Sequence, residues 1–532
     1  MSVLTSRLDP STEDYARNRA ALLAQVEALQ DAQALAVAGG GETYVSRHRS
    51  RGRLLARERI ELLLDPDTAF LELSTLAAWG TEFAVGAAIV TGIGVISGTE
   101  CMIIAHDATV RGGTMNPYTL RKNLRALEIA RVNRLPVVYL VESGGADLPT
   151  QADLFVPFGR VFAELTALSA SGVPSVALVF GNATAGGAYV PAMCDHAVLV
   201  DRQAQVFLGG PPLVKMATGE EADGEALGGA AMHSAVSGLG DLFATDEHDA
   251  LRLGRMVVAR WGWRKAGPSP RPAAPPPRYP AEELLGLVPA DSRVPFDPRE
   301  VLARLVDDSD FDEYKERYGT SLVTGWACLH GYPVGVLANH RGVLFGEEAK
   351  KATEFILRAN QTDTPLIFLQ NTTGYMVGTA YEQAGIVKDG AKMINAVANS
   401  TVPHLTVIMG ASFGAGNYGM SGRAFDPRFL FSWPNARLAV MGATQLAGVL
   451  SIVAKSSAEA SGRVFDAAAD QRRRQSTEEQ IDAESHAFFM SGKVYDDGVL
   501  DPRQTRDALG IALSATHSAP VAGRRGFGTF RM

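Results

Sequence analysis

Residues Ser175–Asp201 read SVALVFGNATAGGAYVPAMCDHAVLVD, and the same pattern returns at His404–Leu430 as HLTVIMGASFGAGNYGMSGRAFDPRFL. The two stretches align without a gap at a constant shift of 229 residues, which pairs Gly187 with Gly416. Each reads as an apolar strand, a turn of small residues and the start of a helix. The chain is therefore predicted to hold two copies of one domain. Two copies of one site suggest two related ligands handled side by side.

The first copy alternates strand and helix patterns. Short, fully apolar runs, typical of strands buried on both faces, occur at Val137–Val141, Val176–Phe180 and Ala197–Val200. A helical stretch, Val161–Ala170, separates the first two of these runs. This order predicts an α/β fold with parallel strands.

Two domains plus extensions fit the 532 residues, which are too many for one core. A Pro-rich stretch, Lys265–Pro280, can neither propagate a helix nor pair in a sheet, and it predicts a semi-rigid linker. A helix is expected from Glu13 to about Leu35. The predicted limits are an N-terminal helical extension at 1–45, a first domain at 46–263, a linker at 264–281 and a second domain at 282–532.

Charge and cysteine content narrow the function classes. A net charge of −8 argues against a nucleic-acid binder, which needs clustered Lys and Arg. Cys101, Cys194 and Cys328 lie too far apart in sequence for a zinc-ligand pair, and their odd number fits a reducing compartment. No apolar run reaches membrane-spanning length, and the N-terminus lacks an apolar signal core. We therefore expect a cytoplasmic protein with no metal and no membrane or nucleic-acid partner.

The small-residue turns, Asn182–Tyr189 and Ala411–Tyr418, are the best candidates for a site. Unpaired N–H groups at a helix start point outward and carry the positive end of the helix dipole. Two such amides aimed at one oxygen form an oxyanion hole, and loss of one donor costs roughly 100- to 1,000-fold in rate. Two alternatives remain open. The turns could serve only as strand-to-helix connections, or Gly414–Gly419, which spells G-x-G-x-x-G, could cradle a nucleotide phosphate.

Candidate side-chain catalysts are few. Glu142 ends a strand in the first copy where the second copy has Asn371, which argues against a shared acid or base role. The stretch GASFG matches the G-x-S-x-G elbow and leaves Ser412 as an alternative nucleophile. His233 is expected at the surface. The Arg-rich segment Ser46–Asp65 is expected to form an exposed basic helix face, or alternatively a patch for a phosphate-bearing ligand.

Long runs in both copies resemble one family. In the first copy they are GGTMNPYTLRKNLRALEIA, ESGGADLPTQADLF, ATAGGAYVPAMCD and FLGGPPLVKMATGEE; in the second they are FLQNTTGYMVG, GIVKDGAKMINAVAN and SFGAGNYGMSGRAFDPRFLFSWPNARLAVMG. Over roughly Ser46 to Asp501 the chain resembles the carboxyltransferase (β) subunits of biotin-dependent acyl-CoA carboxylases, in particular the methylcrotonyl-CoA carboxylase branch. The resemblance implies two tandem crotonase-like (ClpP/crotonase) domains of the β-β-α superhelix type. It also implies an enzyme of leucine or fatty-acid metabolism.

The resemblance further implies roles for the turns. Gly186 and Gly187 would hold the enolate oxygen of an acyl-CoA, and Ala415 and Gly416 would hold the ureido oxygen of biotin. Other substrate contacts would come from residues around the turns, namely Gly144, Gly145, Ala185, Tyr189, Gly210, Phe413, Gly414 and Tyr418.

The implied reaction moves CO2 from carboxybiotin to a short or branched acyl-CoA of the 3-methylcrotonyl-CoA kind. The chain lacks an AMKM attachment motif and has no room for an ATP-binding domain, so a partner would carry the biotin. The resemblance implies a homo-hexamer joined to biotin carboxylase/biotin carboxyl carrier subunits, without a metal in this subunit. Two other functions remain open, a biotin-dependent acyl-CoA decarboxylase and a non-catalytic structural paralogue in a mixed carboxylase complex.

One departure from the methylcrotonyl branch bears on the acyl group. That branch often has PDRDHFGR at a point where this chain, after Phe155, has only Val156-Pro157-Phe158-Gly159-Arg160. A shortened loop is therefore expected beside the acyl pocket. The identity of the acyl group stays open for that reason.

Overall fold

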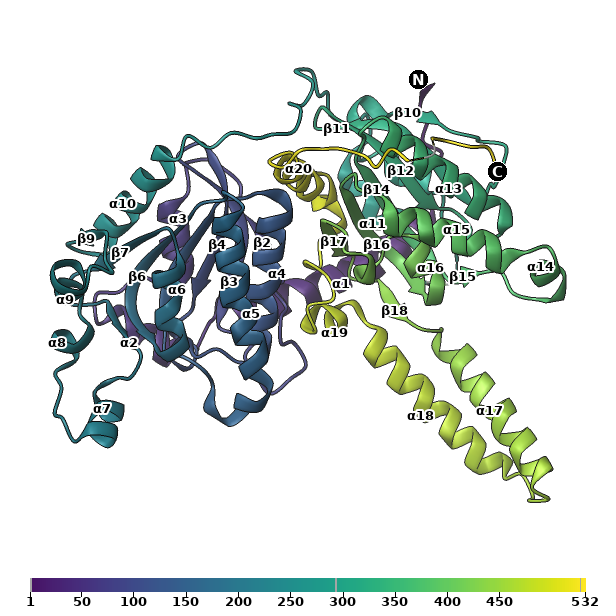
Figure 1. Cartoon of the computed structure of the whole chain (residues 1–532). Coiled ribbons are helices and arrows are strands. Elements are labelled where there is room, and N and C mark those ends of the chain that lie inside the picture. Colours follow the sequence, from purple (N-terminus) through teal and green to yellow (C-terminus); the bar gives the residue numbers. More distant parts are fainter. Residues whose placement is uncertain (1, 292–293, 527) are drawn as a thin grey trace.

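The computed structural model describes residues 2–291, 294–526 and 528–532. It contains two large sheets in two domains, joined by an extended Pro-rich segment (Figure 1). The first sheet has the strand order β2-β3-β4-β5-β6-β7-β9, with β8 paired to β6. Its strands are β2 (Leu71–Leu73), β3 (Ile89–Ile96), β4 (Thr99–His106), β5 (Val137–Ser143), β6 (Ser175–Thr184), β7 (His196–Val200), β8 (Gln205–Phe207) and β9 (Leu242–Ala244).

The second sheet repeats this order as β10-β11-β12-β14-β16-β17, with β18 paired to β16 and β1 added at the β10 edge. The predicted internal duplication is therefore confirmed. Its strands are β1 (Ser2–Val3), β10 (Asp310–Glu313), β11 (Leu322–Leu329), β12 (Tyr332–Asn339), β14 (Leu366–Thr372), β16 (His404–Phe413), β17 (Phe429–Ser432) and β18 (Arg437–Ala439).

Helices cover both faces of each sheet, which explains the fully apolar strands. In parallel strand β5, Tyr139 and Val141 face one core with α4 and α5, whereas Val138 and Leu140 face another with α3 and α10. In the second domain α13 and α15 cover one face and α20 the other. These helices are α3 (Ala56–Leu63), α4 (Pro117–Asn133), α5 (Gln151–Ala170), α10 (Glu247–Arg260), α13 (Gly346–Gln361), α15 (Ile386–Asn399) and α20 (Thr505–Thr516).

The duplication extends to one ion pair in each domain. Asp65 accepts hydrogen bonds from both backbone amides of the β3–β4 turn and pairs with Arg255 of α10 at 2.7 Å. Asp307 does the same for the β11–β12 turn and pairs with Arg506 of α20 at 2.7 Å. Each domain therefore fixes its last helix to its first hairpin by the same contacts.

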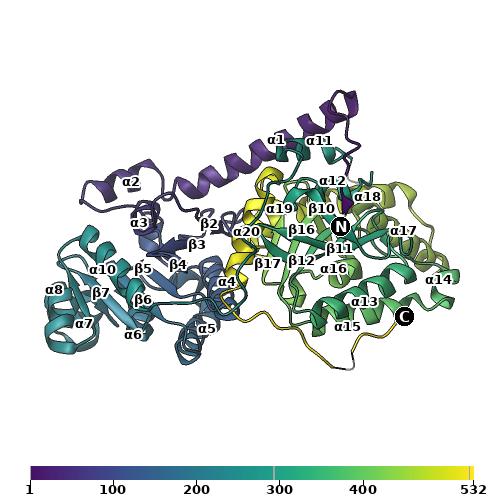
Figure 2. The same cartoon turned by 90° about the horizontal axis from the view of Figure 1, so that it is seen from above.

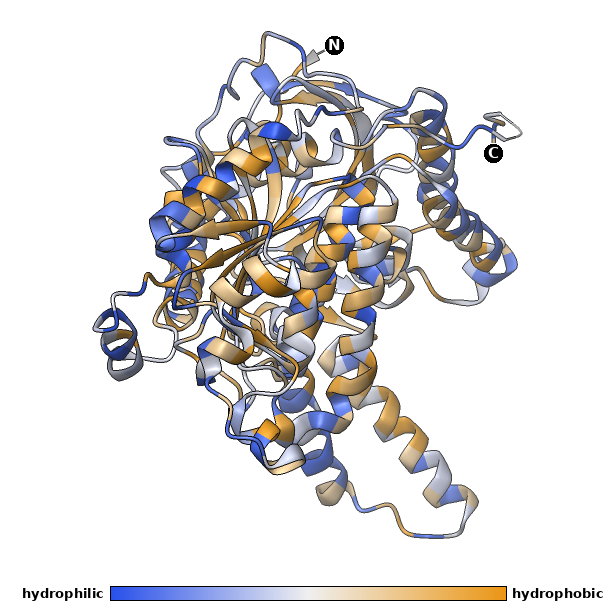
Figure 3. Ribbon diagram, turned by 60° about the vertical axis from the view of Figure 1, so that its left-hand side comes forward, coloured by the Kyte–Doolittle hydropathy of each residue, from blue (hydrophilic) through white to orange (hydrophobic). Residues whose placement is uncertain are grey.

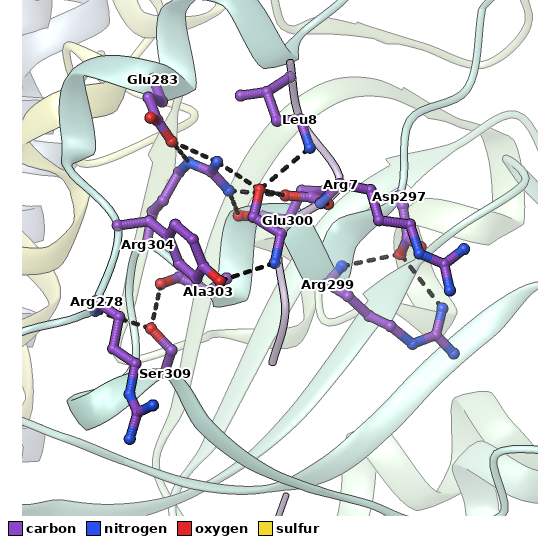
Figure 4. Close-up of polar contacts among 12 residues, drawn as sticks. Arg7, Leu8, Arg278, Glu283, Asp297, Arg299, Glu300, Ala303, Arg304 and Ser309 are labelled. Atoms are coloured by element: carbon purple, nitrogen blue, oxygen red, sulfur yellow. Dashed lines mark hydrogen bonds and ion pairs between the residues drawn. The ribbon is translucent and has the colours of Figure 1, made fainter. Parts of the chain in front are cut away.

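The N-terminal segment belongs to both domains. The expected helix is α1 (Glu13–Val37), which spans the two domains in Figure 2. Before it, strand β1 pairs antiparallel with β10 of the second sheet, which sequence reasoning missed. Arg304 holds this segment by donating to Glu300, Glu283 and the Ser6 hydroxyl (Figure 4).

A buried charge cluster joins the domains. Arg125 of α4 donates to both carboxylate oxygens of Asp497, at 2.8 and 3.0 Å, and Arg423 pairs with the same carboxylate at 2.9 Å. Burial alone would raise the pKa of Asp497, but Arg125 and Arg423 outweigh it and hold that pKa below its usual value. The cluster thus links α4 of the first domain to two residues of the second, Arg423 and Asp497.

A helical hairpin projects from the second domain (Figure 1). It consists of α17 (Ala443–Ala460) and α18 (Ala467–Ser485). Figure 3 shows apolar residues along α17, where the side chains of Val449, Leu450, Ile452 and Val453 are exposed. In the part of the chain that the structure describes, no helix is both long and apolar enough to cross a membrane.

Candidate active site

The two small-residue turns have the same backbone conformation at their fourth position. Ala185 and Gly414, which correspond at the shift of 229, both have φ of +54°. That conformation is unfavourable for alanine, so the first turn keeps a strained residue where the second has glycine. Gly187 and Gly416, two residues further on, are both buried.

The turns differ in the helix that follows. Ala185–Ala188 is a 3-10 turn before α6 (Tyr189–Met193), whereas Gly414–Gly419 forms one α-helix, α16. An α-helix leaves its first amides without intrahelical acceptors, which here include those of Ala415 and Gly416. A 3-10 turn closes its hydrogen bonds one residue earlier. In the first turn, Gly186 is therefore the better donor of the predicted pair.

The loop under each turn is built in the same way. The Ser143 hydroxyl donates to the Gly113 carbonyl and accepts from the Gly145 amide. Thr372 makes the equivalent bonds to Gly342 and Gly374. In the first copy the Gly144 amide also donates within the chain, to Gly112. Because both amides already donate within the chain, Gly144 and Gly145 can contact a ligand by packing but not through their N–H groups.

Glu142 lies behind the first turn in a buried ion cluster. It pairs with Arg53 at 2.5 Å and with Arg59 at 2.7 Å, and Arg59 also pairs with Glu247 at 2.8 Å. Burial would raise the pKa of Glu142, but the two guanidinium groups outweigh burial and lower that pKa. A carboxylate held ionised in this way is a poor proton acceptor. Glu142 therefore has a structural role. Its side chain packs under Gly181, where an added Cβ would lie 2.7 Å from the Glu142 side chain.

The expectation of an exposed basic face at Ser46–Asp65 is wrong for its central arginine. The segment forms α2 (Glu42–Arg49) and α3, and the side chain of Arg59 is 1% exposed. Arg49 and Arg57 also pair with carboxylates, of Glu58 and Glu72. Local spacing did not reveal these partners because several of them lie far away in sequence.

Helix α5 runs beside the first turn. The expectation of a shortened loop at Val156–Phe158 is wrong, because α5 continues through these residues despite Pro157, which removes one helical hydrogen bond. The Phe158 ring covers Gly186, whose Cβ would lie 2.2 Å from it. Phe158 packs edge-to-face on Phe162, with ring centroids 5.3 Å apart, and Phe162 packs on Tyr189 at 5.4 Å.

A cavity of about 570 Å³ adjoins the first turn. Its wall begins with Ala188 and Tyr189, the last two residues of the turn. It continues with apolar residues of β8 and α7 (Pro211–Thr218), the helix that Gly210 caps. His233 also lines it, although it was expected at the surface. Both of its ring nitrogens already have partners, the Ser237 hydroxyl and the Val206 carbonyl, so it is not a free base.

The second turn carries polar support. The Ser412 hydroxyl donates to Gln370 at 2.5 Å and accepts from Asn417 at 2.8 Å. Neither partner is a base, so the arrangement does not favour Ser412 as a nucleophile. The glycines of Gly414–Gly419 form the helix α16 itself, not a loop before a helix, which also disfavours a dinucleotide fingerprint. Phe413 precedes α16, and Tyr418 packs on Phe425 at 5.8 Å.

Known proteins resemble this chain along its whole length. A family model described as a carboxyl transferase domain matches residues 47–528. A probable biotin-dependent acyl-coenzyme A carboxylase beta2 subunit of Mycobacterium tuberculosis is 61% identical over all of both chains. A mitochondrial methylcrotonoyl-CoA carboxylase beta chain of Dictyostelium discoideum is 46% identical, covering 100% of this chain and 91% of that one.

Among solved structures, the geranyl-CoA carboxylase beta subunit of P. aeruginosa superposes with a TM-score of 0.91. It is 41% identical and covers 100% of both chains. This likeness confirms the predicted fold of two tandem crotonase-like domains.

Proposed function

The chain belongs to the carboxyl transferase domain family, as a carboxyltransferase (β) subunit of a biotin-dependent acyl-CoA carboxylase, and on this premise we propose how its two turns divide the reaction. The first turn, with Gly186 and Gly187, holds the thioester oxygen of the acyl-CoA. The second turn, with Ala415 and Gly416, holds the ureido oxygen of biotin. Both act through backbone amides at a helix start.

The observation that carries this proposal is the repeated backbone. The two turns share a residue in the left-handed conformation (Ala185 or Gly414) and, two residues later, a buried glycine. Each turn also begins a helix. A carboxyl transfer generates negative charge on the oxygens of both reactants, so it needs two oxyanion holes. Enolate charge on the thioester oxygen is stabilised most where donors are already oriented.

The surroundings of the second turn fit biotin, which a partner subunit carries. Unpaired amides at a helix start suit a urea-type oxygen, and Tyr418, 44% exposed, offers an aromatic edge beside them. Carboxybiotin supplies the carboxyl group, and the biotin nitrogen from which that group departs can take the proton that the acyl-CoA loses before its new C–C bond forms. The residues of this chain hold the thioester oxygen of the acyl-CoA and the ureido oxygen of biotin in a fixed orientation.

The acyl group that we propose is short or branched and apolar, of the 3-methylcrotonyl-CoA type. The apolar cavity of about 570 Å³ next to the first turn supports this choice. To test it, the subunit is reconstituted with a biotin carboxylase/biotin carboxyl carrier partner, ATP and labelled bicarbonate. We expect the highest kcat/KM for a branched unsaturated thioester among 3-methylcrotonyl-, geranyl-, propionyl- and long-chain acyl-CoA. Absence of label in every thioester would contradict the proposal.

Phe158 sets the acyl size limit in this proposal because its ring lies against Gly186. Replacing Phe158 by alanine should raise kcat/KM for a longer acyl-CoA relative to a five-carbon one by about 10- to 200-fold, as one pocket contact allows. Competition between the two thioesters measures the ratio. Phe155→Ala on the same helix, at a side chain 84% exposed, serves as the matched control with an expected change below about twofold. An unchanged ratio in Phe158→Ala would exclude this role.

The assembly and domain limits are also part of the proposal. We propose a homo-hexamer with a biotin carboxylase/carrier partner in the cytoplasm, and domains at 46–263 and 282–532 separated by a linker at 264–281. The exposed apolar side chains of the α17–α18 hairpin support self-association, because monomers rarely expose such a patch. Light scattering of the purified subunit measures the mass, and a mass other than six chains would contradict the hexamer.

A further inference from the structure

Two buried side chains and a half-buried one beneath the second turn form a polar network that the first turn lacks. We call Gln370, Ser412 and Asn417 the polar triad. The Ser412 hydroxyl donates to the Gln370 side-chain oxygen, and the Asn417 amide donates to the Ser412 hydroxyl. The Gln370 amide donates to the Met420 carbonyl at 2.6 Å. Gln370 and Ser412 are 0% and 1% exposed.

The first copy has apolar residues at the same three positions. At the shift of 229 they are Val141, Ala183 and Ala188, and all three are buried. A single polar residue there would leave a buried group without a partner, which costs about 1–3 kcal/mol. At these three positions the second copy therefore has three polar side chains that bond to one another where the first copy has three apolar ones.

The triad spans the helix that the second turn begins. Ser412, two residues before the helix, accepts a hydrogen bond from Asn417 inside it, and Gln370 holds the carbonyl of Met420 just past its end. Directional hydrogen bonds at both ends favour one backbone geometry, whereas apolar packing is non-directional. This difference accompanies the α-helical form of the second turn and the 3-10 form of the first.

The strand that carries Gln370 also limits the turn. Gly416 lies so close to β14 and its loop that a Cβ would be 2.9 Å from both Thr372 Oγ1 and Gly374 Cα. In the first turn a Cβ on Gly187 would meet nothing nearer than 3.8 Å. The end of β14 thus lies closer to the buried glycine of the second turn than the end of β5 lies to that of the first.

We propose that the polar triad positions the amides of Ala415 and Gly416 for a planar urea-type oxygen, while the apolar backing of the first turn lets it adjust to the acyl group. The triad residues act as positioning residues through the turn and do not touch the ligand. This inference rests on the proposed assignment of the second turn to biotin. Donors that are oriented before the reaction stabilise the developing charge without reorganisation.

The test uses the purified subunit and the reverse half-reaction with free biotin. A carboxylated acyl-CoA loses its carboxyl group as the C–C bond breaks, an N–C bond forms to biotin, and the biotin N–H proton goes to the acyl carbon. We expect Ser412→Ala to lower kcat/KM for biotin at least tenfold. The Kd of the acyl-CoA, measured by calorimetry, should change less than twofold.

A triple variant separates positioning from stability. Gln370→Val with Ser412→Ala and Asn417→Ala installs the residue types of the first copy and leaves only the Met420 carbonyl without its donor. Removing partners together is nearly neutral for stability, so the urea midpoint should recover relative to Ser412→Ala while transfer to biotin stays impaired. Recovery of transfer together with stability would overturn the proposal.

Two controls distinguish the ways in which the inference can fail. Ser175→Ala removes another buried strand hydroxyl, bonded to Asp195 at 2.9 Å, and should leave kcat/KM per folded molecule unchanged. Gly416→Ala tests the turn itself. If Gly416→Ala abolishes transfer and Ser412→Ala does not affect it, the triad inference fails and the proposed function stands. If neither variant affects transfer to biotin, the assignment of the second turn fails.

Discussion

Replacing Gly416 by alanine should lower carboxyl transfer roughly 100- to 1,000-fold, the loss expected for one oxyanion donor. The added Cβ would come within 2.9 Å of Gly374 Cα and Thr372 Oγ1, which are backbone and a hydrogen-bonded side chain that cannot move freely. The turn must therefore shift and misalign its amides. Steady-state kinetics of the reconstituted complex and calorimetric acyl-CoA binding measure the effect. We expect kcat to fall and acyl-CoA affinity to persist.

Two control variants test whether the loss of transfer comes from the second turn itself. Gly448→Ala, in the projecting hairpin where a Cβ meets nothing within 4 Å, should leave transfer unchanged. Gly187→Ala should not lower the free energy of unfolding, because the nearest atom to its Cβ would be 3.8 Å away. Transfer by Gly416→Ala within threefold of the unmodified subunit would refute a role for the second turn.

Replacing Asp497 by asparagine should lower the free energy of unfolding by about 3–5 kcal/mol, the cost of leaving buried charges without their partner. Asp497 is fully buried and neutralises Arg125 of the first domain together with Arg423 of the second. The variant leaves the Arg423 guanidinium without its carboxylate partner and leaves Arg125 paired only with Glu128 of its own helix, at 3.0 Å. Urea unfolding at fixed protein concentration measures the loss.

The pH dependence of that loss follows from the sign of the pKa shift. The folded pKa of Asp497 is lowered, so its contribution is fully present above the unfolded value of about 3.9. The contribution disappears as pH falls through the folded pKa. The difference between the two proteins should thus be constant near neutral pH and shrink below about pH 4. Asp507→Asn, at a side chain 80% exposed, should change stability by less than about 1 kcal/mol. Equal losses in both variants would show that the junction does not depend on Asp497.

Much of the architecture could be predicted from local patterns. Apolar runs such as Val137–Val141 appear in the sequence because a strand covered on both faces needs apolar side chains throughout. The paired turns were visible because small residues and glycine recur at one constant shift. By contrast, the short strand β1 carries too little periodicity to be recognised, and the helical path of α5 through Pro157 contradicts the usual effect of proline.

The sequence by itself determined the duplication, the two turns and the family, because each depends on residue types at fixed spacing along the chain. Only the tertiary structure decided which distant side chains meet. Arg125 and Asp497 are 372 residues apart, and the members Gln370 and Ser412 of the polar triad are 42 apart. The packing of sheets and helices brings such partners together, and local periodicity in the sequence does not indicate which residues they are. Packing also placed Phe158 against Gly186. The sequence had shown where the first turn lies along the chain, but only the tertiary structure showed which side chains surround it.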